Sequence, residues 1–249
     1  MPPPIQDTPQ GRFYFWKGAR YVSVTTVIDR IPKEALQQWK LRKLLEDFRT
    51  HKEHVDDMTP AAALTYLTSL SETARLGSAS TGTNVHRYLE LVSTGQSPSL
   101  SNSEELAGFY QQVDQFIVDY RPNFIESEAR VYSNQWGYAG TLDAIIEIGG
   151  KCYVMDAKSG KRVYPEVALQ LAAYRNADFI GDPDGLERPL PDCSRVAGLV
   201  LHIRPDKYEL RTVTIGPTVH GVFLSALEVY DWSRQDSGFV IGDRVPIYE

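Results

Sequence analysis

Two apolar segments separated by a pair of glycines constrain the fold of this chain more than any other feature. Residues 140–148 and 151–158 have the alternating or continuous apolar pattern of β-strands, and Gly149-Gly150 lies between them. Two glycines at this place predict a two-residue hairpin, because such turns need positive φ angles. The turn fixes the register: Ile148 pairs with Lys151, and each outward step keeps the two residue numbers at the same sum.

This register brings acidic side chains together. Asp143 is expected directly opposite Asp156, with Cβ atoms about 4.5–5.5 Å apart. Two carboxylates this close repel each other unless a positive charge lies between them, and a divalent cation would provide it. Lys158 follows Asp156 by two residues and shares its strand face, whereas Ala157 points away.

Two acids and a lysine on one face suit metal-dependent phosphodiester hydrolysis. The metal makes bound water easier to deprotonate, and the lysine stabilises charge on the phosphate. The simpler alternative is that Asp143 marks a strand end and that Asp156 and Lys158 form an exposed salt bridge. An Asp-x-Lys triplet alone does not decide between metal-dependent hydrolysis and an exposed salt bridge. The decision therefore depends on the surrounding sequence.

The remaining sequence predicts a single globular unit, because 249 residues with 42% hydrophobic content can bury one core. We expect a hairpin and helical layer at 1–80, a catalytic core at 81–215, and a C-terminal helix and tail at 216–249. The predicted elements are two strands in RFYFWKGARYVSVTTVI around Lys17-Gly18, helices at 34–49, 60–75 (capped by Thr59), 82–92, 103–120, 166–178 and 217–232, and further strands at 128–134, 196–204 and 208–215.

The net charge of −6 argues against a protein that coats nucleic acid by bulk electrostatics. A local basic groove remains compatible with this charge, and two clusters could contribute to it. The first cluster is equally compatible with a solvated helix surface, whereas the second directly follows the predicted catalytic strand. These clusters are Lys33, Lys40, Arg42 and Lys43, and Lys158, Lys161 and Arg162.

Two further observations bear on the compartment. No apolar run approaches the roughly 18 residues that cross a bilayer, and the first residues lack the blocks of a secretory signal, so we expect a soluble cytoplasmic protein without a membrane partner. Cys152 and Cys193 are too few for a disulfide framework or for the four thiolates of an iron–sulfur cluster. Both are therefore expected to be reduced and structural.

Four segments resemble, in order, the motifs of the RecB-like branch of the PD-(D/E)XK nuclease superfamily. They are GTNVH, GYAGTLDAI, YVMDAKSGK and QLAAY, spanning residues 82–174, and residues 21–39 resemble the entry segment of phage-type members. The resemblance implies an α/β fold with a restriction-endonuclease-like core, in which helices flank a mixed central sheet, and a helical N-terminal layer. It also implies a Mg²⁺- or Mn²⁺-dependent DNA exonuclease of recombination, repair or phage DNA processing, in the cytoplasm of a bacterium or phage-infected host cell. A homo-oligomer or a recombination partner protein would be compatible with it.

The same resemblance implies roles for individual residues. Asp143 and Asp156 would be metal-binding carboxylates, and the backbone carbonyl of Ala157 would be a further ligand. Lys158 would be the catalytic lysine, and His86 would add a nitrogen ligand. A lone histidine is more often structural, so the ligand role of His86 depends on the resemblance.

Six more residues are candidates around this centre. Gln170 and Tyr174 stand four apart on one predicted helix face, where the resemblance places a feature that contacts nucleic acid beside the active site. For the others, an exposed surface charge is the alternative to a role. They are Lys161 and Arg162 as phosphate contacts, and Glu128 and Glu90 as secondary candidates for holding the site together.

The sequence departs from part of the superfamily. Aspartate rather than glutamate stands at position 156, which is within the superfamily's range, and the four cysteines of iron–sulfur members are absent.

Two alternative functions remain open. A structure-specific endonuclease would use the same metal centre, and a non-catalytic DNA-binding module would keep only the fold, although the complete set of His86, Asp143, Asp156 and Lys158 speaks against this.

Overall fold

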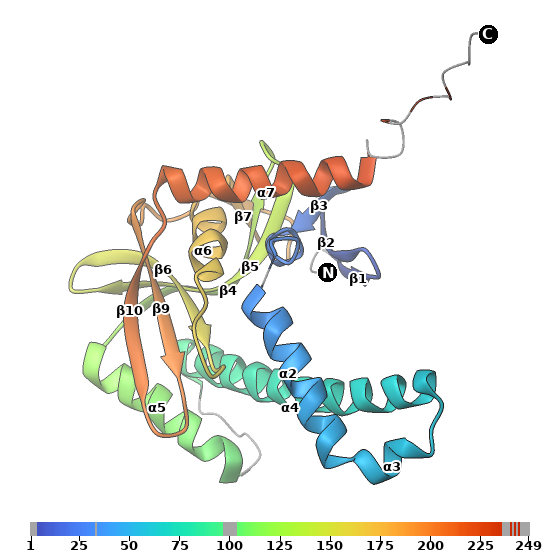
Figure 1. The fold of residues 1–249 in the computed structure, drawn as a ribbon. Helices are drawn as coiled ribbons and strands as arrows, with labels where there is room; N and C mark the ends of the chain where they lie inside the picture. The colour runs from blue at the N-terminus through green and yellow to red at the C-terminus, as the bar shows by residue number, and fades with distance from the viewer. Residues whose placement is uncertain are drawn as a thin grey trace.

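The computed structural model describes residues 4–32, 34–96 and 104–235, together with 240, 242 and 244. It is a mixed α/β protein in which helices cover a ten-stranded mixed sheet (Figure 1). Within these residues no helix combines the length and apolar character needed to cross a bilayer. The strands are β1 (Ile5–Thr8), β2 (Gly11–Trp16), β3 (Ala19–Ser23), β4 (Asn123–Ser133), β5 (Tyr138–Ile148), β6 (Lys151–Lys158), β7 (Phe179–Gly181), β8 (Glu187–Arg188), β9 (Ala197–Ile203) and β10 (Tyr208–Thr214). The helices are α1 (Val24–Ile28), α2 (Glu34–Thr50), α3 (Lys52–Asp56), α4 (Pro60–Ser93), α5 (Glu104–Tyr120), α6 (Glu166–Arg175) and α7 (Pro217–Gln235).

Strand β5 is the centre of the sheet. It pairs antiparallel with β4 and β6 and parallel with β3, which contacts only its first residues. Strand β6 continues the sheet through a parallel pairing with β9, and β10 completes that side. The N-terminal hairpin therefore belongs to the same sheet as the central strands.

The predicted glycine hairpin is confirmed. Gly149 and Gly150 have φ angles of 57° and 73°, and the ladder runs from Ile148–Lys151 to Ala144–Met155 in the expected register. The ladder ends one pair before Asp143 and Asp156, so these residues are not a directly hydrogen-bonded pair. The reason is that β6 turns to its other neighbour here, where Asp156 pairs with Val200 of β9.

The sheet separates two hydrophobic cores, and β6 contributes alternate residues to them. Met155 and Ala157 belong to the core shared with α4 and α5, whereas Val154 belongs to the core shared with α1, α6 and α7. Because strand side chains alternate, Asp156 and Lys158 share the face of Val154. The predicted orientation of the acid and the lysine on one face is thereby confirmed.

Helix α4 is a single helix, whereas the sequence predicted separate helices at 60–75 and 82–92. The predicted cap is present, because the Thr59 side chain accepts a hydrogen bond from the Ala62 amide at 3.3 Å. The expected break is absent, and hydroxyl groups in this stretch bond to carbonyls one turn back within the helix, as Thr81 does to Gly77 and Thr83 does to Ala79.

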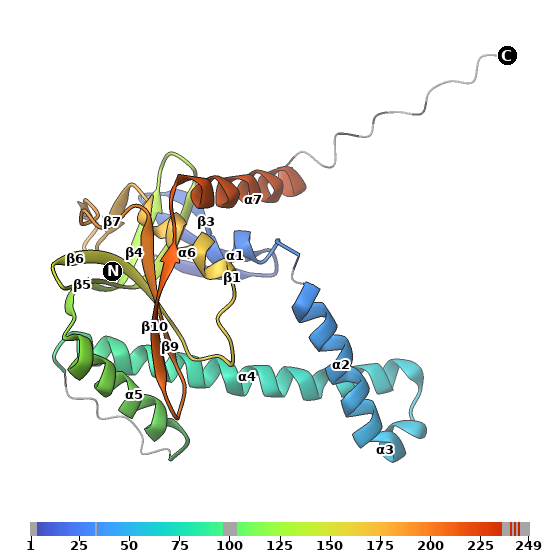
Figure 2. The same ribbon diagram turned by 60° about the vertical axis from the view of Figure 1, so that its left-hand side comes forward.

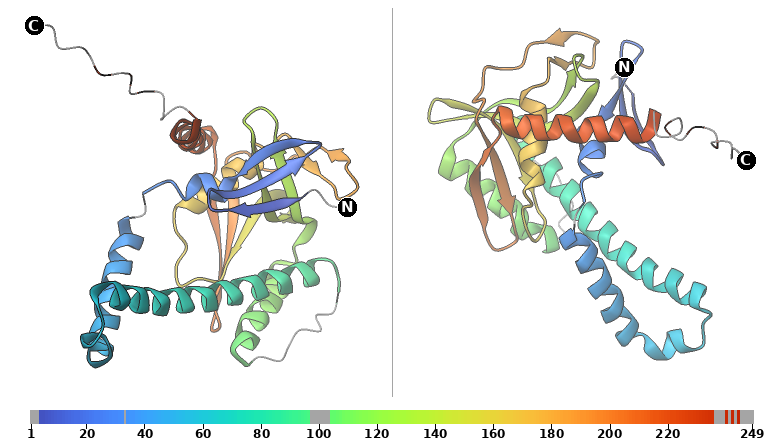
Figure 3. Two further views of the ribbon diagram at one scale, coloured as in Figure 1. Left: turned by 90° about the vertical axis from the view of Figure 1, so that its right-hand side faces the viewer. Right: turned by 45° about the horizontal axis from the view of Figure 1, so that its top comes forward.

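Helix α4 lies across the sheet at one end and extends past it at the other. Figures 2 and 3 show α5 packed beside one end of α4 and α2 and α3 beside the other end, which projects away from the sheet. This projection holds much of the predicted N-terminal helical layer.

The other elements agree with the sequence to within a few residues, with two exceptions. The second strand of the N-terminal hairpin ends at Ser23, and Val24–Ile28 forms helix α1 instead of continuing as a strand. Its β-branched residues favour a strand, but burial of Val24, Val27 and Ile28 in the core with α6 and α7 outweighs that preference. The short strands β1, β7 and β8 and the short helix α3 were not predicted.

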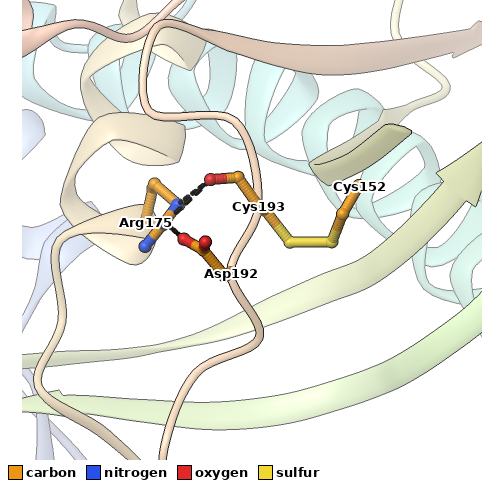
Figure 4. The surroundings of a disulfide bond; sticks show 4 residues. All are labelled: Cys152, Arg175, Asp192 and Cys193. Atoms are coloured by element: carbon orange, nitrogen blue, oxygen red, sulfur yellow. Dashed lines mark hydrogen bonds and ion pairs between the residues drawn. A yellow bond between two sulfur atoms is a disulfide. The ribbon is translucent and has the colours of Figure 1, made fainter. Parts of the chain in front are cut away.

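The expectation of two reduced cysteines is wrong in this structure. Cys152 on β6 and Cys193 in the loop before β9 form a disulfide (Figure 4). The Arg175 guanidinium holds this loop by donating to the Cys193 carbonyl at 2.7 and 3.0 Å. A cysteine count gives no information on proximity, and these residues are 41 positions apart.

Candidate metal centre

Three potential ligand side chains meet beside the end of the glycine hairpin. His86 comes from α4, Glu128 from β4 and Asp143 from β5, and each offers one ligand atom within 4.8 Å of the other two. His86 Nδ1 lies 3.4 Å from Asp143 Oδ1. The sequence predicted a break in α4 before His86. In the structure the helix is continuous through His86, the residue that offers the nitrogen ligand.

Glu128 reaches this group through an unusual backbone. Its φ angle is 49°, a conformation that non-glycine residues rarely adopt and that costs on the order of 1–3 kcal/mol. The pairs Ser127–Ala144 and Ala129–Leu142 on either side fix its position across from Asp143. Glu128 was predicted only as a secondary candidate, and the structure places it among the potential ligands.

Asp156 and Lys158 form an ion pair next to this group. Lys158 Nζ donates to Asp156 Oδ1 at 2.8 Å and lies 2.6 Å from Oδ2. The Asp156 side chain is only 1% exposed, so this is not the exposed salt bridge of the simpler alternative. Although Oδ2 is near the ammonium group, it is buried and accepts no hydrogen bond from the described residues.

Asp143 is held by the strand beside it. Its Oδ2 accepts a hydrogen bond from the Ala157 amide at 2.6 Å, and its side chain is 11% exposed. In the structure, Ala157 therefore contacts Asp143 through its amide nitrogen. The ligand role of the Ala157 carbonyl stays a prediction. The amide of Ala157 fixes Asp143 relative to Asp156, the residue directly before it.

The titratable groups show how strongly the charges interact. Burial, reinforced by the charge of Asp143, raises the pKa of Glu128 to about 7 and that of Asp156 to about 6. Burial opposes protonation of His86, but the charge of Asp143 outweighs it and raises the pKa of His86 to about 9. Burial likewise opposes ionisation of Asp143, yet the neighbouring His86 lowers its pKa. The three carboxylates therefore interact strongly with one another and with the cationic His86 and Lys158.

A divalent cation fits these residues. The His86, Glu128 and Asp143 ligand atoms lie within 4.8 Å of one another, and carboxylate and imidazole groups are ligands that divalent cations accept. The Asp156 carboxylate is a further oxygen donor, for which a cation would compete with the Lys158 ammonium 2.6 Å from Oδ2. Mixed carboxylate and imidazole donors suit Mn²⁺ as well as Mg²⁺.

Gln170 and Tyr174 of α6 extend the site on the Lys158 side. Lys158 Nζ donates to Gln170 Oε1 at 3.4 Å, and Gln170 Nε2 donates to the Tyr174 hydroxyl at 3.2 Å. Tyr174 is buried, as expected of a core residue. Its hydroxyl holds Gln170, which in turn contacts the lysine.

Gly140 leaves the space that the Tyr174 ring occupies. A Cβ atom at this position would lie 2.4 Å from Tyr174 Cε1, and the ring is buried on all sides. We expect Gly140→Ala to lower the free energy of unfolding by about 2 kcal/mol, measured by urea denaturation. Gly221→Ala is the control, because its Cβ meets nothing within 4 Å in helix α7 and should leave stability unchanged or slightly raised. Equal stability of Gly140→Ala and the wild type would contradict this packing.

The remaining predicted residues lie at the edge of the centre or outside it. Glu90 pairs with Arg87 at 2.6 Å on the surface of α4 and is not among the three potential ligands. Lys161 and Arg162 are exposed and form no ion pair within the described residues. Lys40, Arg42 and Lys43 lie on α2, with Lys43 paired to Asp47, and Lys33 lies outside the described residues.

A large pocket, which was not predicted from the sequence, lies next to this centre. It has a volume of about 830 Å³ and lies between α1, α6 and α7, with Lys158 and Gln170 in its lining. Its residues are far apart in the sequence and read individually as ordinary helix and loop positions. No sequence signal identified it.

Comparison with known proteins gives little further information. The sequence matches no protein-family model and no curated protein. Among solved structures, the chain is similar to the crystal structure of SSO0001, with 13% sequence identity, a TM-score of 0.36, and coverage of 86% of this chain and 77% of that chain. A likeness at this level supports no conclusion about function.

Proposed function

We propose that this protein is a divalent-metal-dependent DNA exonuclease with a RecB-like PD-(D/E)XK core. The observation that supports it most is the buried Asp156, which is paired with Lys158 and lies beside the His86–Glu128–Asp143 group. A purely structural ion pair would not need three further titratable groups around it. The four ordered sequence motifs support the same assignment, with recombination, repair or phage DNA processing in the cytoplasm as its setting.

The cation would be held by His86, Asp143 and Asp156, with Glu128 as a further oxygen donor. A bound divalent ion would act as a Lewis acid, lowering the pKa of water and neutralising charge on the phosphate. The Ala157 amide keeps Asp143 in place for this task.

Lys158 is the residue best placed to contact the scissile phosphate. It is anchored by Asp156 and Gln170, yet its side chain remains 37% exposed and can reach a substrate. Its ammonium group would stabilise negative charge that develops on the phosphate oxygens. Lys161 and Arg162, exposed and without ion pairs in the described residues, would contact neighbouring phosphates.

Glu128 offers a specific test of the ligand set. We expect Glu128→Gln to weaken Mn²⁺ binding about tenfold in calorimetry, since one charged oxygen donor is lost. Glu90→Gln is the matched control, because Glu90 pairs with Arg87 outside the group of potential ligands, and its affinity should stay within about twofold of the wild type. Equal Mn²⁺ affinity of the two variants would remove Glu128 from the ligand set.

The mode of cleavage is tested with three substrates: end-labelled linear duplex, end-labelled single strands, and closed circular DNA, each with Mg²⁺, Mn²⁺ or EDTA. An exonuclease degrades linear substrates only when metal is present and leaves circles intact. Cutting of circles would support the endonuclease alternative. Binding without cleavage under every condition would support the non-catalytic DNA-binding module.

A further inference from the structure

The pocket beside the candidate centre has two chemically different ends. Its interior is lined by apolar side chains from the α1 region, α6 and α7, among them Ile28, Val167, Leu169 and Val219. The other end contains Lys158 and Gln170, which belong to the candidate centre as well. The pocket is therefore continuous with the place where a phosphate would be held.

Charged and aromatic groups surround the end near the centre. Arg162 and Tyr164, from the loop after β6, both line the pocket. Arg162 has no ion pair in the described residues, and Tyr164 is 55% exposed. The pocket thus offers the Arg162 guanidinium to a phosphate and the Tyr164 ring to a base that could stack on it.

The pocket also contains an unused hydrogen-bond acceptor. Glu166 belongs to its lining, and the buried Oε2 of this side chain has no hydrogen-bond partner in the described residues. A buried acceptor without a partner is unfavourable, and a rotation of the Glu166 side chain toward the pocket would let an N–H group of a ligand satisfy it. Nucleobases carry such N–H groups on the edges of otherwise apolar rings.

We propose that this pocket binds the nucleoside attached to the phosphate that Lys158 contacts. The inference rests on the proposed nuclease function and specifies how the substrate is seated. A nucleotide matches the pocket at both ends, with its phosphate at Lys158 and Arg162 and its base against the apolar interior. The volume of about 830 Å³ lies in the range of about 300–1,000 Å³ that accommodates ligands of this size.

Binding in this pocket requires an unpaired base, because a base inside a duplex cannot leave its stack to enter a pocket without losing its pairing partner. We therefore expect the protein to bind a single-stranded terminus, or a frayed one, more tightly than a blunt duplex.

The test uses single-stranded oligonucleotides with one 2-aminopurine at the 5′ end, the 3′ end or the middle. Fluorescence is recorded in Ca²⁺, with excitation at a wavelength that tryptophan does not absorb. The variant Val222→Trp fills the pocket from α7. Val229→Trp is its matched control, since Val229 lies on the same helix, is 61% exposed and is not part of the pocket.

We expect at least one position of 2-aminopurine to change its fluorescence on binding to the wild type and to Val229→Trp. Val222→Trp should bind that oligonucleotide about tenfold more weakly. The proposal is overturned if no position responds, or if Val222→Trp behaves like the wild type. Mn²⁺-dependent cleavage of the same oligonucleotides is measured in parallel. Cleavage without a fluorescence response rejects the pocket alone, whereas a response without cleavage rejects the proposed nuclease.

Discussion

Asp156→Asn is expected to lose metal-dependent DNA hydrolysis by a factor of about 10³ or more, equivalent to about 4 kcal/mol of transition-state stabilisation. The asparagine has the same shape but lacks the charge that a divalent cation requires. The protein should nevertheless stay folded in EDTA, because the change removes a buried charge that lies beside Asp143. Activity is measured as release of end label, and stability as the melting temperature with EDTA and with Mn²⁺.

The control for this variant is Asp206→Asn in the turn between β9 and β10, where the side chain is exposed. Its activity and its stabilisation by Mn²⁺ should match the wild type, whereas Asp156→Asn should lose most of the Mn²⁺-induced rise in melting temperature. An Asp156→Asn protein that cleaves DNA at the wild-type rate would exclude the proposed centre.

Lys158→Met is expected to lose activity by a factor of about 10²–10³ while still binding Mn²⁺. Lys158 Nζ lies 2.6 Å from Asp156 Oδ2, where it competes with a cation for the carboxylate. Without metal, this variant should be less stable than the wild type, since the buried Asp156 loses its ion pair with Lys158. Addition of Mn²⁺ should then raise its melting temperature by more than that of the wild type.

Lys161→Met provides the comparison for Lys158→Met, because it removes the same charge from the loop that follows the same strand. We expect it to keep wild-type stability in EDTA and to lose activity by less than about tenfold, in line with a contact to a peripheral phosphate. If Lys158→Met and Lys161→Met lose activity equally, Lys158 has no special catalytic role.

The central part of the candidate site could be predicted because it depends on local sequence. Gly149-Gly150 fixes the hairpin register, and the alternation of strand side chains puts Asp156 and Lys158 on one face. The separation of four between Gln170 and Tyr174 likewise puts both on one helix face, and the structure joins them by a hydrogen bond. These relations need only the geometry of one hairpin and one helix.

The parts that could not be predicted depend on contacts between distant segments. The positive φ angle of Glu128 exists because pairs on both sides hold β4 against β5, which no local pattern reveals. Helix α4 is continuous although its glycine and hydroxyl residues often end helices, and its Val85 and Leu89 are buried in the core shared with α5 and the sheet. The Cys152–Cys193 disulfide and the pocket between α1, α6 and α7 both depend on tertiary structure.

The proposed chemistry is tested most directly by the rate of label release from end-labelled linear DNA by the wild-type protein, in Mn²⁺ and in EDTA. We predict release in Mn²⁺, none in EDTA, and recovery when Mn²⁺ is added in excess of the chelator. Equal release in EDTA, or no release at any Mn²⁺ concentration from duplex or single strands, would contradict a metal-dependent exonuclease centred on Asp143, Asp156 and Lys158.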